Sequence, residues 1–203
     1  MEKSISLLVL ALALATPSTA NAQAVPVKWS VLSKPVYLHT AMPAGCDEPL
    51  VRAVATWNAQ TVKFKYQFDK AANLTTTRWS VSNNANVTIE DGVTSSAAAL
   101  MSTSRRTTGT TIVDADITVK GEYLWYNSDE SGGKFYCSAT AGTTPSTKYD
   151  YQTAMAHELG HAFGMDHGGA TTCIIYASLG AGVARRTPCA TEVTAFRGAY
   201  GTQ

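Results

Sequence analysis

The chain has no excess of either charge and, beyond its first residues, no long hydrophobic run. Its 203 residues include 16 lysines and arginines against 15 aspartates and glutamates, a formal net charge of +1. Nucleic acids and acidic membranes attract strongly basic proteins, so we expect neither as a partner. After residue 22 no stretch approaches the roughly 18 consecutive apolar residues typical of a membrane span. We also find no internal repeat and no long linker.

The first 22 residues have the pattern of a signal peptide. Lys3 precedes an apolar stretch over residues 5–15, and Ala20-Asn21-Ala22 follows the small-x-small rule of a cleavage site. We therefore predict a signal peptide over residues 1–22 and a single domain over residues 23–203. The protein is expected to be secreted, extracellular or periplasmic, and monomeric.

Cysteine is scarce, and all four cysteines lie in the predicted exported part: Cys46, Cys137, Cys173 and Cys189. An even number in an exported chain predicts two disulfides. Three pairings are possible. We favour Cys173 with Cys189, which closes a short loop, and this leaves Cys46 to pair with Cys137. A cysteine bound to a metal is the competing interpretation, but the histidines described next make it unnecessary.

Histidine is also rare, yet three of the four histidines fall within the run HELGHAFGMDH. His157, His161 and His167 stand with Glu158 and Gly164 in the spacing H-E-x-x-H-x-x-G-x-x-H. Residues four apart lie on one face of a helix, so the first two histidines can point toward one metal ion. A glycine can adopt a positive φ and turn the chain, which would return the third histidine to that ion.

Three protein ligands leave one position of a tetrahedral zinc ion open, as in catalytic rather than structural sites. Glu158 follows His157 directly, where it can take a proton from a water on the metal without binding the metal itself. The motif therefore predicts one catalytic Zn²⁺ ion bound by His157, His161 and His167. It also predicts a hydrolase with Glu158 as general base and then general acid. We interpret His39 as an ordinary strand residue.

Hydrophobic periodicity predicts an α+β fold. Leu50, Val54 and Trp57 indicate a helix over residues 47–60 with Asp47 as its cap. Asp150 is expected to cap a second helix that carries the histidines, and a third helical pattern covers residues 191–200. Exposed loops are expected at residues 129–133 and 140–147. Strands are predicted at residues 35–40, 62–68, 78–82, 86–90, 99–104 and 111–120.

These features make the chain resemble the metzincin clan of zinc endopeptidases, and within it bacterial matrixin-like enzymes. The resemblance rests on HELGHAFGMDH, on Trp57-Asn58 at the end of the early helix, and on IVDADI (residues 112–117) followed by Trp125. Gly168 stands where astacin-like enzymes carry a glutamate. The resemblance implies a twisted mixed sheet with an early helix and an active-site helix, then a smaller C-terminal subdomain. It also implies an edge strand near residues 99–104 that pairs with an extended peptide.

The chain departs from this family below the metal. Metzincins carry a methionine in a tight turn there, and Ile175 is the matching residue, an apolar substitute that we expect to be tolerated. Tyr176 follows directly, so the zinc-contacting tyrosine of some relatives is not carried over. No cysteine precedes the predicted domain to cap the zinc. His39 alone remains for any second histidine-rich zinc site, which is therefore excluded.

Calcium is a possible but unsupported second cofactor. Asp114, Asp116, Asp129 and Glu130 could offer oxygen ligands. Because no dense Asp-Asn-Gly loop is present, we interpret these residues as solvated carboxylates.

The sequence thus predicts a secreted zinc endopeptidase that hydrolyses peptide bonds in proteins. Residues 174–179 are expected to form part of the wall of its substrate pocket, and the glycine-rich residues 180–182 to leave that pocket open to several side chains. One alternative is a secreted zinc-binding module, an adhesin or decoy, that cuts weakly or not at all. Glu158 argues against it, because zinc binding alone does not need that carboxylate. Another is a processing enzyme with one protein substrate.

Overall fold

The computed structural model describes residues 24–40, 44–70, 74–75, 86–92, 94–96, 98–121, 134–138 and 140–203. The predicted signal peptide, the predicted strand at residues 78–82, the loop at residues 129–133 and Trp125 lie outside these ranges. Within them, every helix is too short or too polar to cross a membrane.

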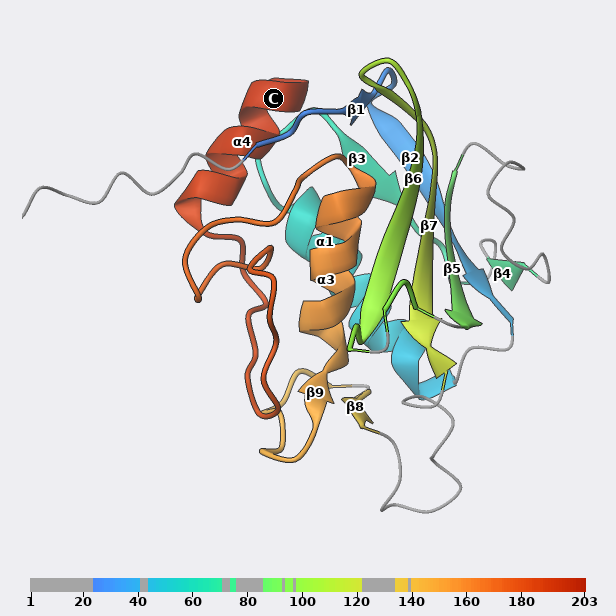
Figure 1. The fold of residues 1–203 in the computed structure, drawn as a ribbon, viewed down its shortest axis with the longest axis vertical. Coiled ribbons are helices and arrows are strands. Elements are labelled where there is room, and N and C mark those ends of the chain that lie inside the picture. Colours follow the sequence, from blue (N-terminus) through green and yellow to red (C-terminus); the bar gives the residue numbers. More distant parts are fainter. Residues whose placement is uncertain are drawn as a thin grey trace, which may run out of the picture.

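A seven-stranded, mostly parallel sheet forms one layer of the molecule (Figure 1). Its longest strand, β7 (Thr111–Lys120), pairs in parallel with β5 and antiparallel with β6 (Met101–Thr108). Within the described residues β6 pairs with β7 alone, so its outer side is a free edge. The remaining strands are β1 (Lys28–Trp29), β2 (Ser33–His39), β3 (Lys65–Gln67), β4 (Leu74–Thr75) and β5 (Val87–Gly92).

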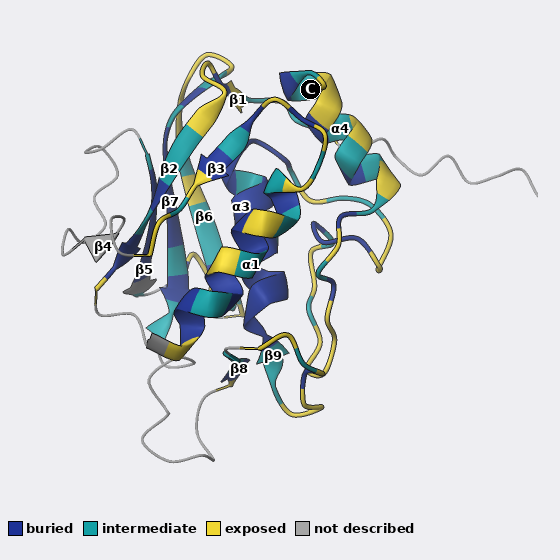
Figure 2. Cartoon of the chain, turned by 180° about the vertical axis from the view of Figure 1, so that it is seen from behind, coloured by how far each residue is buried: buried dark blue, intermediate teal, exposed yellow. Residues whose placement is uncertain are grey.

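Helices α1 (Asp47–Asn58) and α3 (Tyr151–Ala162) lie side by side on the same side of this sheet (Figures 1 and 2). Figure 2 shows α3 buried along most of its length. Trp57 joins the two helices, because its ring is fully buried and its Nε1 donates a 2.8 Å hydrogen bond to the carbonyl of Ala156. The same ring meets Phe163 edge-on, with 4.7 Å between centroids, and α4 (Ala190–Tyr200) adds Phe196 to this aromatic core.

The start of α3 is fixed by Asp150, as predicted. A two-stranded sheet of β8 (Phe135–Tyr136) and β9 (Tyr149–Asp150) leads into the helix, and the Asp150 carboxylate accepts the N–H of Thr153 at 2.8 Å. Burial alone would raise the pKa of Asp150. Hydrogen bonds from Arg186, Thr153 and Thr144 outweigh it and hold the pKa below its usual value.

The predicted cap of α1 is wrong. Cys46 is the N-cap residue and makes no side-chain capping bond, while Asp47 is the first residue of the helix. The Asp47 carboxylate instead pairs with Lys70 at 2.7 Å. The side chain of Cys46 forms a disulfide instead.

Both predicted disulfides are present. Cys46 pairs with Cys137 across 91 residues, which links the start of α1 to the segment that leads toward α3. Cys173 pairs with Cys189 across 16 residues and links the turn after the histidine motif to the start of α4. The second disulfide therefore closes a loop within the chain after His167 and fixes the turn after the motif to the start of α4.

The predicted fold class is confirmed, with a mixed sheet, an early helix and a second helix that carries the motif. The segment at residues 62–68 forms only the short strand β3, although Val62, Phe64 and Tyr66 are buried in the expected alternation. Strand β6 begins and ends later than predicted, because its serines, threonines and arginines carry no hydrophobic period.

The interpretation of Asp114 and Asp116 as solvated carboxylates is wrong, because they are only 1% and 2% exposed. Both lie on the same face of β7, since they are two residues apart. Among the described residues their Oδ1 atoms have no hydrogen-bond partner. Burial, together with the charges of Asp114 and Glu90, raises the pKa of Asp116 to about 7. Asp129 and Glu130 lie outside the described residues.

Candidate active site

The structure brings the three histidines of the motif together. His157 and His161 lie one turn apart on α3, and their Nε2 atoms are 3.0 Å apart. The Nε2 of His167, beyond the helix, lies 3.2 Å from that of His157. A tetrahedral zinc ion with Zn–N bonds of about 2.0–2.1 Å would separate its nitrogen ligands by about 3.3 Å. The three imidazoles therefore fit a single zinc ion.

Backbone carbonyls fix the orientation of two of these rings. The Nδ1 of His157 donates to the carbonyl of Ile174 at 2.8 Å, and the Nδ1 of His161 donates to that of Met165 at 2.7 Å. With the proton on Nδ1, each Nε2 presents a lone pair to the shared point. Burial lowers the pKa of His157 to about 3 and that of His161 to about 4. Both rings are therefore neutral near pH 7, which is the form that binds metals.

Gly164 makes the predicted turn. Helix α3 ends at Ala162, and Gly164 has a φ of +118°. A Cβ atom at this position would lie 1.8 Å from the carbonyl oxygen of Val27, so the N-terminal segment leaves no room for a side chain. The turn sends the chain back toward α3 and places His167 beside the other two histidines.

Three aromatic side chains bind the carbonyls at the end of α3. Tyr66 Oη donates to the carbonyl of Leu159 at 2.6 Å, and Trp29 Nε1 donates to that of Ala162 at 2.9 Å. Tyr200 Oη donates to the carbonyl of Phe163 at 2.6 Å. The carbonyls of Ala162 and Phe163 lie at the end of the helix, where carbonyls have no partner within it, so the bonds from Trp29 and Tyr200 satisfy them. The carbonyl of Leu159 already accepts the N–H of Phe163 at 3.1 Å, and Tyr66 adds a second hydrogen bond to it. These bonds also fix the helix end that carries His161.

Glu158 is buried beside the histidines, with 6% of its surface exposed. Thr103 of β6 donates a 2.6 Å hydrogen bond to its Oε2. Burial raises the pKa of Glu158 to about 7, while the bond from Thr103 acts in the opposite direction. Two residues along β6, Arg105 pairs with Asp166 at 2.8 Å and lies 3.3 Å from the carbonyl of His161. The sequence did not predict a role for Thr103 or Arg105. The only signal was that residues two positions apart on a strand point to the same face, here the face toward α3.

A cleft of about 950 Å³ runs across the site. Residues of β6 and the segment before it line one side, residues 176–179 and Arg185 line the other, and Glu158 and the three histidines lie between them. The predicted wall is thus partly wrong, because Ile174 and Ile175 are fully buried and do not reach the cleft. Residues 180–182 do not line it either.

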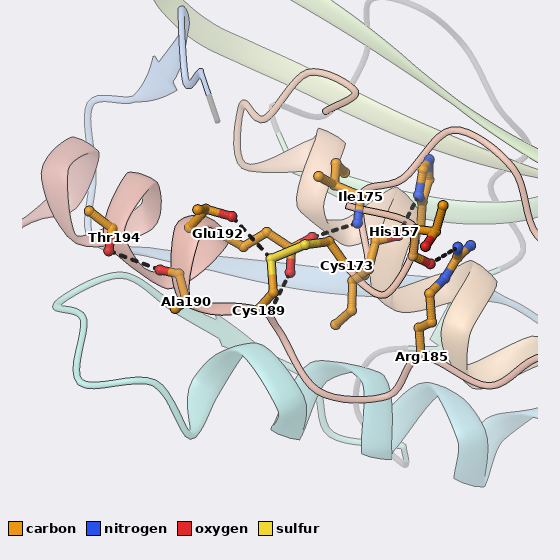
Figure 3. Close-up of a disulfide and its surroundings, with 11 residues drawn as sticks. His157, Cys173, Ile175, Arg185, Cys189, Ala190, Glu192 and Thr194 are labelled. Carbon is orange, nitrogen blue, oxygen red and sulfur yellow. Dashed lines mark hydrogen bonds between the residues drawn. A yellow bond between two sulfur atoms is a disulfide. The ribbon is translucent and has the colours of Figure 1, made fainter. Parts of the chain in front are cut away.

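Ile175 lies in the turn beneath α3, where metzincins, which the sequence resembles, carry a methionine. Its side chain is fully buried, and a Cβ atom on Gly160 of α3 would lie 2.9 Å from its Cδ1. Figure 3 shows Ile175 and His157 near the Cys173–Cys189 disulfide and Glu192 of α4. Glu192 accepts the N–H groups of Ile175 and Cys189 at 2.6 and 2.7 Å. The isoleucine is therefore an apolar floor, as expected.

Comparison with known families agrees with this arrangement. The family model for matrixins matches residues 22–190, which is most of the chain. The chain therefore belongs to the matrixin family of metallopeptidases, within the metzincin clan, and the resemblance seen in the sequence is confirmed. No individual curated protein matches the chain. Matrixins normally bind zinc and act on peptides or proteins.

Proposed function

We propose that this matrixin is a secreted zinc endopeptidase, with residues 23–203 as its catalytic domain and residues 1–22 as its signal peptide. His157, His161 and His167 would hold one zinc ion. The observation that carries the proposal is the meeting of three Nε2 atoms beside the Glu158 carboxylate in one cleft. The two disulfides support export, because they persist in oxidising compartments.

When bound, zinc polarises the substrate carbonyl and lowers the pKa of a bound water from about 15.7 to about 7. Glu158 takes one proton from the water as the oxygen of that water attacks the carbon of the scissile carbonyl. It then delivers that proton to the nitrogen of the leaving amine as the C–N bond breaks. The Thr103 hydrogen bond holds the carboxylate in place during both transfers.

An extended substrate would pair with the free edge of β6, which borders the cleft. Main-chain hydrogen bonds along a strand edge bind a peptide whatever its side chains. Selectivity among substrates must then come from contacts between substrate side chains and the residues that line the cleft.

The test is digestion of unfolded casein by the mature protein, with and without a zinc chelator, alongside Glu158→Ala. We expect about one zinc per chain in both proteins by mass spectrometry. The variant should lose roughly 10²–10⁴-fold in activity, the usual contribution of a general base. A Glu48→Ala variant is the matched control and should stay active, because the Glu48 side chain is half-exposed on α1 and does not line the cleft. Near-normal turnover by Glu158→Ala would remove Glu158 from its role, and zinc binding without any cleavage would favour a binding module.

A further inference from the structure

Part of the lining of the cleft comes from residues at the start of α3 and from the chain that follows the histidine motif. We call it the side pocket and define it by Tyr149, Thr153, Ala154, Tyr176, Leu179 and Arg185. Figure 1 shows the segment after the motif on the opposite side of α3 from β6. The side pocket therefore lies across His157 from the strand edge, where a side chain next to the scissile bond would enter.

Arg185 is the only arginine or lysine among the described residues that define the side pocket. It is 8% exposed, and its backbone N–H is fixed by Thr153 Oγ1 at 2.8 Å. Its Nη1 donates to the carbonyl of Thr171 at 2.9 Å, and its Nη2 donates to that of Ser178. The guanidinium carbon lies 5.5 Å from the centre of the Tyr176 ring. These contacts hold the group rigidly in the wall beside His157, as Figure 3 shows.

The same contacts leave hydrogen-bond donors unused. A guanidinium has five N–H groups, and the two carbonyls occupy two of them. The buried Nε has no partner among the described residues. No carboxylate there forms an ion pair with Arg185. Glu192 acts on it at longer range, but its oxygens already accept the N–H groups of Ile175 and Cys189.

A buried charge whose counter-charge makes no direct ion pair with it is costly unless another group pairs with it. Of the other carboxylates that line the cleft, Glu158 is bound by Thr103 and Asp166 by Arg105. Arg185 is thus a fixed cation that lines the space a substrate would fill, and its Nη1 and Nη2 each keep one N–H that the two carbonyls do not use. A carboxylate matches the geometry of the guanidinium fork and can take two hydrogen bonds from it.

We infer that Arg185 is a specificity-determining residue that makes this peptidase select substrates with an aspartate or glutamate next to the scissile bond. This inference rests on the proposed function, because it requires a peptide in the cleft. It replaces the pocket open to several side chains that the glycines at residues 180–182 suggested. In a purely structural role, Arg185 would hold the loop through Thr171 and Ser178 and leave side-chain preference unaffected.

The test compares two matched peptide libraries, one containing aspartate and glutamate and the other asparagine and glutamine in their places. With the mature zinc-loaded protein we expect cleavage of the acidic library to be about tenfold faster or more, the range of one charge-assisted hydrogen bond. Mass spectrometry should place an acidic residue beside the cut. Equal rates, or cuts without acidic neighbours, would overturn the inference even though cleavage itself supports the proposed function.

Variants separate specificity from structure. Arg185→Met should bring the ratio of the two rates close to one, and Arg185→Lys should keep part of the preference. Arg197→Met removes an exposed arginine of α4 and should leave the ratio unchanged. If Arg185→Met fails to fold, the ratio of the two cleavage rates in the wild-type protein still tests the preference for acidic residues. Binding of both libraries to zinc-loaded Glu158→Ala gives a readout without turnover, in which equal affinity would count against Arg185.

Discussion

Glu192 of α4 holds Ile175, seventeen residues earlier, through a 2.6 Å hydrogen bond to its backbone N–H. The carbonyl of Ile174, one residue before, accepts the Nδ1 proton of His157. A buried carboxylate in the last helix therefore supports the orientation of a proposed metal ligand through a single turn of chain. This connection makes α4 part of the support of the site.

Glu192→Gln should destabilise the protein. A glutamine offers one acceptor oxygen where the carboxylate offers two, so either Ile175 or Cys189 would keep an unpaired, buried N–H. We expect a loss of about 1–3 kcal/mol, or roughly 3–10 °C in Tm, measured by calorimetry. Zinc affinity should fall with it. Glu48→Gln on the exposed face of α1 should change neither quantity, and an unchanged Tm for Glu192→Gln would show that the turn does not depend on this carboxylate.

Gly164→Ala should prevent correct formation of the site. The new Cβ would lie 1.8 Å from the carbonyl oxygen of Val27, so the backbone at Val27 or at residue 164 would have to shift. Gly109→Ala is the matched control, because Gly109 also has a positive φ, +60°, but nothing lies within 4 Å of its added Cβ. We expect circular dichroism melting to show a small loss for Gly109→Ala and a much larger one for Gly164→Ala, with lost zinc. Equal losses of stability in the two variants would mean that the positive φ, and not the contact with Val27, accounts for the effect.

Thr103→Val should lower kcat about tenfold or more and leave zinc content and KM nearly unchanged. The substitution keeps the shape of the side chain and removes the donor to Glu158, and hydrogen bonds to charged groups contribute about 1.5–3 kcal/mol. Thr103→Ser restores the donor and should restore the rate. Steady-state kinetics on one peptide would measure both, and a Ser variant as slow as the Val variant would point to packing instead.

Asp116→Asn should stabilise the protein at pH 8 and have little effect near pH 4. The pKa of Asp116 is raised from 3.8 to about 7. Its contribution to stability is therefore complete below about pH 4 and is lost as the pH rises through 7. An asparagine stays neutral throughout, so the difference in Tm from wild type should grow with pH. A difference that is constant from pH 4 to 8 would contradict this. If millimolar calcium at pH 8 raises the Tm of the wild type but not that of Asp116→Asn, a cation bound beside Asp116 would be the explanation instead.

The elements predicted well from the sequence are those with a strong local pattern. The spacing of Leu50, Val54 and Trp57 gave α1, and the Asp150 cap and the histidine spacing gave α3. The alternation in residues 111–120 gave the bounds of β7. Strand β6 was misplaced because an edge strand with one solvent-facing side and small polar residues has little hydrophobic period to detect.

The site was predicted only as far as its motif extends. The three histidines and Glu158 lie within eleven consecutive positions, so their spacing carries the geometry. Thr103, Arg185 and Glu192 reach the site from other elements, and only tertiary packing brings them there. Burial of Asp114 and Asp116 was missed for the same reason, because two carboxylates on an alternating strand look solvent-exposed until the neighbouring elements are known.

The end of α3 has a consequence for how the protein is made. Its carbonyl partners are Trp29, Tyr66 and Tyr200, drawn from the beginning, middle and end of the described chain. During synthesis, the helix with two of the histidines emerges about 40 residues before the Tyr200 hydroxyl does, and a ribosome adds only about 5–20 residues each second. For those seconds the last turn of α3 lacks one of the three side chains that donate hydrogen bonds to its carbonyls. The proposed protease therefore acquires its fully supported site only after residue 200 has been added, so completion of the helix that carries two histidines depends on α4.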